Sequence, residues 1–332
     1  MPTRTLHIDV LVIGAGVTGA TIAAQFAEQG ALVGVVDALS SSRAARAELS
    51  LVTPHLHPDH FATTARGVEQ FVQRCTQYGV PYQPCEVLHA ATTQRGEAQM
   101  RTAIAQYASV LRDWIGPTAR GAGGSVGFII RKSALVDASQ LVARMLEHPN
   151  IILRQSVEVL GLDYRGGVMY ALASGYTFTA KWVVLATNAF TGLLSPYLAE
   201  SVRFATGALW QSYPLRSGVL LPERPVVLDD GAYVFIPSAE RRLYIRTWTT
   251  HKNGYLADPL QQLSELLKRI DPALLEYTAE RRLSVLTFTD DQAPLVGRIE
   301  SGAPVLYALG LGMFGLAWAP IVAERVVSLA QS

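Results

Sequence analysis

Three glycines near the start of the chain, Gly14, Gly16 and Gly19, constrain its fold more than any other feature. They follow an apolar run at residues 8–13 and precede a segment of helical character, Ala20–Gln29. A strand, a GxGxxG turn and a helix in this order are typical of a dinucleotide-binding unit. In such a unit the first glycine permits the tight turn, the second lets a pyrophosphate approach the backbone, and the third allows the helix to pack closely on the strand. We therefore expect a Rossmann-like α/β fold.

The apolar run Ala31–Val36 predicts a second strand, which is followed by Asp37 about twenty residues after the turn. A carboxylate at this point accepts hydrogen bonds from both hydroxyls of an adenosine ribose, an interaction worth roughly 1.5–3 kcal/mol. Val17 and Thr18 stand where the helix N-terminus faces the phosphates, with roughly half a positive charge from the helix dipole. NAD and FAD share this opening, so these residues leave both cofactors open.

Composition narrows the class of protein. The 332 residues allow two domains, and 28 basic against 27 acidic residues argue against a strong nucleic-acid footprint. The two cysteines, Cys75 and Cys85, are too few for a metal set or a disulfide framework, and we interpret both as structural thiols in a reducing compartment. No basic segment followed by an apolar core precedes the first strand, so we expect a cytoplasmic protein. The uncharged stretch 301–323 contains glycines and prolines that predict a strand, a turn and a helix instead of a membrane span.

Apolar runs resembling the first strand recur near residues 151, 182 and 305, so both ends of the chain contribute to one sheet. We expect a discontinuous nucleotide-binding domain at residues 1–80, 125–200 and 285–332. Residues 81–124 and 201–284 would form a smaller α+β substrate domain with a mixed or antiparallel sheet. The expected strands are Glu86–Ala91, Ile151–Leu153, Trp182–Leu185, Tyr233–Ile236, Leu243–Thr247 and Val305–Leu309, and helices are expected at Gln94–Trp114, after Asp137 and after Asp258.

Two further segments carry a likeness to a known family. Val183–Phe190 reads VVLATNAF, and Leu309–Pro320 reads LGLGMFGLAWAP. With the first glycine turn, these make the chain resemble the FAD-dependent D-amino-acid oxidase family, which includes glycine oxidase and sarcosine oxidase. The resemblance covers essentially the whole length. It implies FAD as the cofactor, and hydride transfer from a carbon bearing nitrogen, with an imine that water then hydrolyses.

The resemblance also implies the remaining cofactor contacts. Ala186 and Thr187 would lie in a strand and turn of the FAD domain, and Val157 would lie at the adenine. The terminal glycine turn would place backbone amides by the pyrimidine edge of the flavin, where a helix start stabilises negative charge. Those amides belong to Gly312, Met313, Phe314, Gly315 and Leu316. The family position that bears a covalent flavin link falls at Ser284, which implies FAD held without a covalent bond.

The chain departs from the family pattern where the substrate binds. Leu286 stands where family amino-acid oxidases carry an arginine for the substrate carboxylate, and leucine cannot imitate that planar, bidentate contact. Arg246 offers a substitute, because strand alternation places it on one face with Tyr244 and Trp248. A surface or interdomain salt bridge is the alternative role for Arg246. Two further departures, Asn188 for glycine and Leu311 for histidine, alter the lining without supplying an acid or base.

The loop at 50–58 sits where family members cover the flavin with a chain segment. Its residues look most like those in the oxidoreductase domain of a bifunctional tRNA wobble-uridine modification enzyme, so tRNA stays open as a substrate despite the near-neutral charge. We take Arg246, Tyr244, His55 and Tyr233 as candidate substrate contacts. Two histidines in the loop do not complete a metal site, and we expect no metal.

We therefore hypothesise an FAD oxidase or dehydrogenase acting on the C–N bond of an amine or amino-acid-like substrate, with O2 or another electron acceptor. The alternatives are a tRNA wobble-uridine oxidoreductase and a flavin-binding protein without turnover. The sequence sets neither the substrate, nor the acceptor, nor the oligomeric state.

Overall fold

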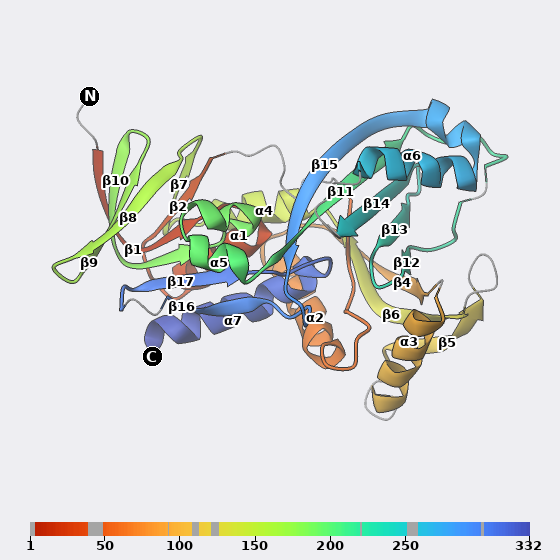
Figure 1. Ribbon diagram of the computed structural model, residues 1–332, viewed down its shortest axis with the longest axis horizontal. Helices are drawn as coiled ribbons and strands as arrows, with labels where there is room; N and C mark the ends of the chain where they lie inside the picture. Colours follow the sequence, from red (N-terminus) through yellow and green to blue (C-terminus); the bar gives the residue numbers. More distant parts are fainter. Residues whose placement is uncertain are drawn as a thin grey trace.

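The structure, a computed structural model, describes residues 4–38, 49–91, 93–107, 113–120, 126–219, 221–250, 258–299 and 302–332. Two sheets form two lobes, and segments from all parts of the chain alternate between them (Figure 1). The first sheet has a parallel centre built from both ends of the chain. Its order is β16 (Leu295–Arg298), β17 (Val305–Leu309), β10 (Tyr176–Leu185), β1 (Arg4–Ile13), β2 (Val33–Asp37) and β7 (Ile151–Gln155), with the hairpin β8 (Val159–Arg165) and β9 (Val168–Ala173) joined to β10.

The central strands of this sheet are apolar on both faces because each face is covered. All five residues of β2 are buried, as are the last four of β1. On one face the core includes residues of four helices, α1 (Val17–Glu28), α2 (Phe61–Gln77), α4 (Ala138–Leu146) and α7 (Gly315–Gln331). The other face packs against the β8–β9 hairpin and α5 (Pro196–Glu200). Parallel sheets covered in this way are typical of doubly wound nucleotide-binding folds.

Helices α2 and α7 cross at very close range beside the sheet. A side chain at Gly67 of α2 would collide with the carbonyl of Ala317 in α7, so only glycine fits there. The contact brings a helix from the first quarter of the chain onto the last helix. It thereby fixes the C-terminal helix against the strand ends.

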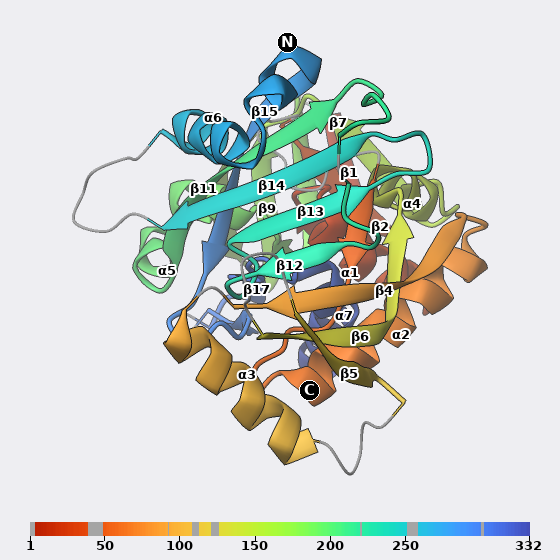
Figure 2. The same ribbon diagram turned by 90° about the vertical axis from the view of Figure 1, so that its right-hand side faces the viewer.

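The second sheet is antiparallel apart from one parallel pair, β12 with β4. Its order is β15 (Thr278–Phe288), β11 (Arg203–Ser212), β14 (Leu243–Thr250), β13 (Tyr233–Pro237), β12 (Val226–Leu228), β4 (Tyr82–Ala90), β6 (Val126–Val136) and β3 (Ser50–Val52), and β5 (Ile115–Arg120) pairs with β6. Helix α6 (Pro259–Ile270) and the short η3 (Pro272–Tyr277) cover β11, β14 and β15, while α3 (Gln94–Tyr107) lies beside β5 (Figure 2).

The expected α/β class with a Rossmann-like domain and a mixed second sheet is confirmed. Strand β17 has the predicted bounds, and Asp137 and Asp258 cap their helices, accepting from the amides of Gln140 and Leu260. The helix expected at Ala20–Gln29 begins earlier, at Val17, because the glycine turn is shorter than assumed.

Two local predictions were wrong. The helix expected to reach Trp114 has left helical geometry before that residue, since Trp114 lies in a turn and β5 begins at Ile115; residues 108–112 lie outside the described part. The segment 50–58 is not all loop, because β3 pairs with β6 over Ser50–Val52. In both places strand pairing with β6 determines the local structure.

The proposed domain boundaries remain a proposal, but the sheets divide the chain more finely than those boundaries do. Strands β3 and β6 fall in the ranges 1–80 and 125–200, yet both pair in the second sheet. Within the described residues, no helix is both long and apolar enough to cross a membrane.

Candidate active site

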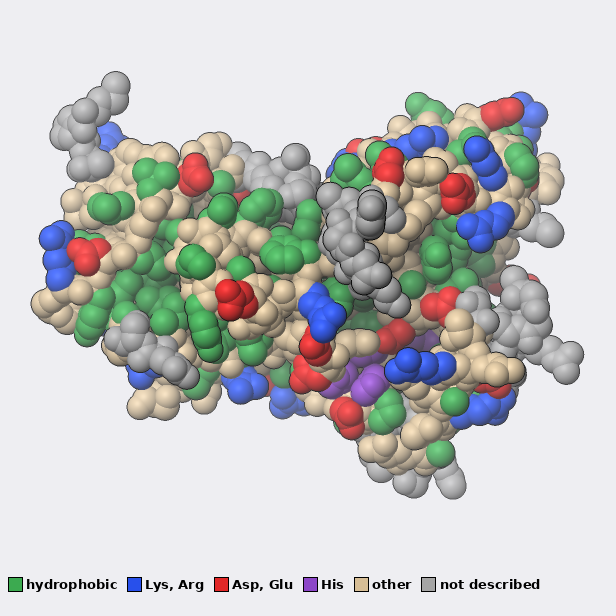
Figure 3. All heavy atoms as spheres, viewed as in Figure 1, with side chains coloured by type: hydrophobic (Ala, Val, Ile, Leu, Met, Phe, Trp, Pro, Cys, Tyr) green, Lys and Arg blue, Asp and Glu red, His purple; other side chains and the backbone are tan. Residues whose placement is uncertain are grey.

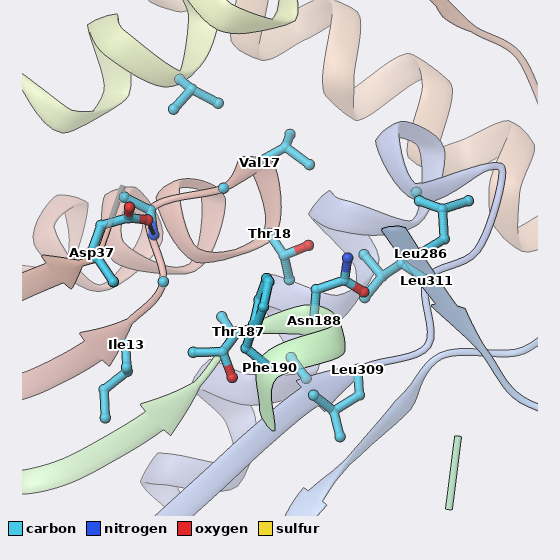
Figure 4. Close-up of a pocket in the computed structure, with 18 of the residues that line it drawn as sticks. Ile13, Val17, Thr18, Asp37, Thr187, Asn188, Phe190, Leu286, Leu309 and Leu311 are labelled. Atoms are coloured by element: carbon cyan, nitrogen blue, oxygen red, sulfur yellow. Dashed lines mark hydrogen bonds between the residues drawn. The ribbon is translucent and has the colours of Figure 1, made fainter. Parts of the chain in front are cut away.

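A cavity of about 620 Å³ lies between the two sheets. One wall is formed where four parallel strands end, at Gly14 after β1, Asp37 in β2, Thr187 after β10 and Leu309 in β17. Open parallel sheets bind ligands at this edge. The opposite wall comes from the second sheet, through Ser50, Arg246, Trp248 and Leu286. Figure 4 shows Asp37 and Leu286 at opposite ends of the pocket.

The glycine turn has the geometry that a pyrophosphate requires. Gly14 has φ +103°, and a Cβ there would lie 2.5 Å from the carbonyl oxygen of Ala186. Gly16 lines the cavity, and a Cβ on it would meet no atom within 4 Å, so the space beside it is open to a ligand. A side chain on Gly19 would collide with the carbonyl of Gly14. Gly19 thus lies outside the lining and serves the packing of α1 on β1, as its sequence position indicates.

Helix α1 begins at Val17 without a side-chain cap, so its first amides face the cavity with the positive end of the helix dipole. An anionic group fits this position. Val17 and Thr18 both line the cavity, and Thr18 lies between its two ends (Figure 4). The turn therefore fits the phosphates of a dinucleotide.

Asp37 lies at one end of the cavity. Its side chain is 8% exposed, and Oδ2 accepts a hydrogen bond of 2.6 Å from the amide of Ala15. The carboxylate thus also braces the glycine turn, a role that the sequence did not predict. The amide of Val157 donates to the Asp37 carbonyl at 3.1 Å, which brings Val157 into the lining beside it. This end fits a ribose and an adenine.

The C-terminal glycine turn forms the other end. Gly310 and Gly312 have φ of +70° and +60°, and the amide of Gly312 donates to the carbonyl of Thr287 at 3.0 Å. Helix α7 then begins at Gly315 without a side-chain cap. Met313, Gly315 and Leu316 line the cavity, whereas the Phe314 side chain packs away from it with Trp318.

A hydrogen-bonded cross-link joins three walls of the cavity. Asn188, at φ +50°, accepts with Oδ1 from both the amide of Thr287 (3.1 Å) and its hydroxyl (2.7 Å). The Asn188 amide group donates to the carbonyl of Val285 at 3.0 Å, and the Thr287 hydroxyl accepts from the amide of Gly310 at 3.2 Å. Leu286 lies between the two bonded residues of β15. Asn188, Leu286 and Leu311 lie near one another in Figure 4.

Arg246 supplies a positive charge to the wall that the second sheet forms. It projects from β14, where Nη2 donates to the carbonyl of Leu49 (3.0 Å) and to the hydroxyl of Ser50 (3.1 Å). Its Nε is buried with no hydrogen-bond partner, and no carboxylate of the described residues forms an ion pair with it. Burial lowers the pKa of the Arg246 guanidinium to about 10. A desolvated cation without a counter-charge fits an anionic ligand.

The structure separates the candidate substrate residues. Of the four, only Arg246 lines the cavity, and Trp248 on the same strand lines it too. Tyr244 is 7% exposed and packs with Leu135 and Ile236 instead, because the twisted strand carries it past the edge of the cavity. Tyr233 and His55 also lie outside the lining.

Several lining residues had no signal in the sequence. Ser139 and Val142 come from α4, and Phe190 and Leu193 from η2 (Asn188–Leu193). Only the cap at Asp137 indicated a helix start near the first pair. The second pair is 43% and 78% exposed and forms an apolar rim.

No group of three or more potential metal ligands is arranged to hold an ion within the described ranges. Cys75 and Cys85 are unpaired and lie away from the cavity. Burial raises the pKa of the Cys75 thiol to about 11 and that of Cys85 to about 12, so both are unreactive thiols at neutral pH.

Comparison with known proteins gives three kinds of match. The model of the family described as FAD dependent oxidoreductase (DAO) matches residues 9–329. A curated relative, the tRNA 5-methylaminomethyl-2-thiouridine biosynthesis bifunctional protein MnmC of Hahella chejuensis, is 26% identical over 99% of this chain and 57% of its own length. The chain thus spans a little over half the length of this relative.

Two solved structures share the fold over nearly the whole chain. Iminodiacetate oxidase from Chelativorans sp. superposes with a TM-score of 0.76 at 22% identity, covering 97% of this chain and 95% of its own. Glycine oxidase from Bacillus cereus gives a TM-score of 0.75 at 18% identity, covering 98% and 95%.

Proposed function

Because the chain belongs to the family of FAD-dependent oxidoreductases, we propose that it oxidises a carbon–nitrogen bond of a small, anionic amine or amino-acid-like substrate. We assign the FAD site to the open face of Gly16, the uncapped start of α1 and one side chain, the carboxylate of Asp37. When bound, FAD supplies the acceptor for a hydride. The remaining tasks, which are to bind, orient and desolvate the substrate, fall to the residues of the substrate wall.

Arg246 is the observation that carries this proposal. Arg246 lines the cavity, and its guanidinium has lost much of its water and lacks a carboxylate partner among the described residues. A substrate carboxylate would supply the missing charge and an acceptor for the unpaired Nε–H. Ser50 and Leu49 hold the guanidinium on one side, so the ligand approaches from the cavity side.

The reaction balances without a protein acid or base. The substrate amine binds in its neutral form after giving its proton to solvent, and the carbon next to nitrogen gives up a hydride. The resulting imine adds water, and its C–N bond breaks to give a free amine and a carbonyl compound. Trp248, Leu286 and Leu311 surround the reacting end with apolar surface that excludes water until the imine has formed.

The first test is anaerobic reduction of the purified, yellow protein by a panel of glycine, sarcosine, iminodiacetate, D-amino acids and amines without a carboxylate. We expect bleaching by a compound that carries both an amine and a carboxylate. Bleaching by neutral amines alone would contradict the anion site, and a colourless protein that takes up no FAD would contradict the cofactor.

The Arg246→Leu variant tests the anion site directly. Loss of a desolvated charge pair is worth about 2–5 kcal/mol, so KM should rise by roughly 30-fold or more while kcat changes little. R246K should recover part of the loss, and R282L, on the exposed part of β15, should leave KM unchanged. Glu48 precedes Leu49 in the sequence and lies outside the described residues. A large change of KM in E48Q would place the counter-charge in the chain itself and overturn the proposal.

A second candidate function is oxidation of a modified tRNA wobble uridine. The observation that favours it is the curated relative, whose name specifies tRNA 5-methylaminomethyl-2-thiouridine biosynthesis. A yellow protein that no small amine reduces, but that total tRNA from cells with incomplete wobble modification does reduce, would support it. If neither bleaches the protein, the alternative of a flavin-binding protein without turnover is favoured. A reducing, cytoplasmic location, inferred from two unpaired cysteines, belongs to the proposal as well.

A further inference from the structure

Four of the seven histidines gather behind the C-terminal glycine turn. The rings of His55, His57 and His60 lie 4.8–5.5 Å apart between centroids; His60 stacks on both others, while His55 and His57 are tilted by 32°. His89, on β4, is 3% exposed and bonds to the hydroxyl of Thr53 at 3.1 Å. Figure 3 shows histidine side chains in the hollow between the two lobes, with acidic side chains beside them. None of these four histidines lines the active-site cavity.

His55 is the member that reaches the turn. Its ring is 1% exposed and stacks on the Phe314 ring at 4.4 Å between centroids and 17° between planes. Its Nε2 lies 2.8 Å from Oδ1 of Asp230 and donates to that carboxylate. Phe314 stands at the start of α7, and both its neighbours in the chain, Met313 and Gly315, line the cavity. His55 therefore fixes the far side of the segment whose near side faces the cofactor.

Asp230 lies in a turn whose backbone has an unusual conformation. Asp229, Asp230 and Gly231 all have positive φ, at 49°, 58° and 88°. The left-handed region costs free energy for a residue with a side chain, so Asp229 and Asp230 persist there in succession only where contacts hold them. The amide of Asp229 donates to the Ala90 carbonyl at 3.0 Å, and a Cβ on Gly231 would lie 3.2 Å from Cβ of Met313. Gly231 of this turn therefore lies against Met313, while the carboxylate of Asp230 accepts the hydrogen bond from His55.

We propose that His55 and Asp230 form a positioning pair for the cofactor, which clamps Met313 and Phe314 from two sides and so sets the start of α7 against the cavity. The pair joins the segment after β3 to the β12–β13 turn, 175 residues away. Backbone amides bind a ligand only at a narrow range of distances, so a displaced turn weakens FAD binding even though neither residue touches the cavity. The inference rests on the FAD assignment and is independent of the substrate.

The test is the dissociation constant of FAD, measured by flavin fluorescence on apo-protein of each variant. Loss of a hydrogen bond to a charged group predicts about tenfold weaker binding or more in D230A. D230N keeps an acceptor oxygen and should weaken binding by about threefold, between wild type and D230A. H55Q should resemble D230A, and the H55Q/D230A double variant should bind no more weakly than the worse single variant.

The chain offers matched controls for both residues. The His57 ring lies 5.5 Å from that of His55 between centroids and is tilted by 32°, but within the described residues no ring contact joins it to Phe314 and no hydrogen bond joins it to Asp230; Asp59 is 77% exposed. H57Q and D59N should bind FAD with wild-type affinity. Equal weakening in H57Q and H55Q, or FAD binding within twofold of wild type in both H55Q and D230N, would overturn the proposal.

A second readout separates positioning from general destabilisation. The shape of the visible absorption band and the midpoint potential of bound FAD report on the amides around it. Both should shift in H55Q and D230N and stay unchanged in the controls. Variants whose apo-protein loses stability to urea while the bound FAD keeps its spectrum and potential would show a structural role only, and would also overturn the proposal.

Discussion

The two halves of the cavity are built in different ways. The half that we assign to FAD has one contiguous part, Gly14–Asp37, which offers backbone amides and a single carboxylate, and it is completed by Val157, Thr187 and the C-terminal glycine turn. The half that we assign to the substrate comes from side chains of β3, β14 and β15, and Ser50 of β3 is 196 residues from Arg246 of β14. The contiguous part of the first half is specified by local geometry, whereas the second half exists only after two sheets have met. The comparison shows why a shared cofactor can accompany very different substrates.

The variant with the largest expected effect on FAD binding is Gly16→Val. Gly16 has φ −71°, which any residue adopts, and its Cβ position is open, so the variant should fold. The added side chain would fill the space of the pyrophosphate, and FAD binding should fall by at least about 100-fold, as expected for a lost phosphate contact together with a steric clash. Flavin content of the purified variant measures this, with circular dichroism as the control for folding. Retained flavin would contradict the assignment of the turn.

Asp37→Ala should have a smaller effect on the same half. It removes a charged acceptor worth about 1.5–3 kcal/mol, which predicts FAD binding weaker by roughly tenfold to 150-fold. Titration of the apo-protein with FAD measures the change. D37N keeps an acceptor for the Ala15 amide and should lose less. Unchanged FAD affinity in D37A would contradict the proposal that the ribose binds at this end of the cavity.

Thr287→Val tests the joint between the halves. Valine has the shape of threonine but leaves the Gly310 amide and one bond of Asn188 unsatisfied, which costs about 1–3 kcal/mol in a buried site. Urea unfolding should show this loss, while T287S, which keeps the hydroxyl, should retain more of the stability. An unchanged free energy of unfolding would mean that the cross-link does not hold the walls together.

The weakest effect is a pH dependence confined to the substrate half. The pKa of Arg246 is lowered to about 10 by burial, so the free protein loses this charge as pH rises through that value. An anionic substrate binds the charged form and stabilises it. Because the substrate amine must lose its proton to bind, the KM of every variant falls as pH rises toward the pKa of the amine. The ratio of the KM of R246L to that of the wild type removes this dependence; it should be constant below pH 9, about halve at the pKa of Arg246 and fall further above it, while kcat shows no break there. Initial rates across pH 8–11 measure both, and R246K separates this group from others.

The geometry of the N-terminal glycine turn could be predicted because its information is local. Gly14 has the positive φ and Gly19 the close approach that their spacing indicates, Gly16 has open space beside it, and Asp37 lines the cavity. The contacts of these residues with FAD stay predictions. The substrate half was predicted only in part. Alternation places Tyr244 on the same face of β14 as Arg246, but Tyr244 packs with Leu135 and Ile236 outside the cavity lining, and a pattern of period two does not show how far along a strand a cavity extends.

Other features could not be predicted from the sequence because the residues that contact one another there are far apart in the chain. Strand β6 depends on pairing with β3, β4 and β5, and His55 depends on Asp230, far along the chain. Non-local contacts of this kind leave no mark in a local window. The loop around His55 could be singled out by its histidines, but its contact with Phe314 could not.

The last strand and last helix, β17 and α7, complete the wall that β1 begins. During synthesis the N-terminal glycine turn leaves the ribosome long before Leu309–Leu316 exists, so a nascent chain carries the motif without an enclosed pocket. A closed FAD pocket can therefore form only after Leu309–Leu316 has been synthesised, and FAD that binds the closed pocket then stabilises the folded chain against unfolding.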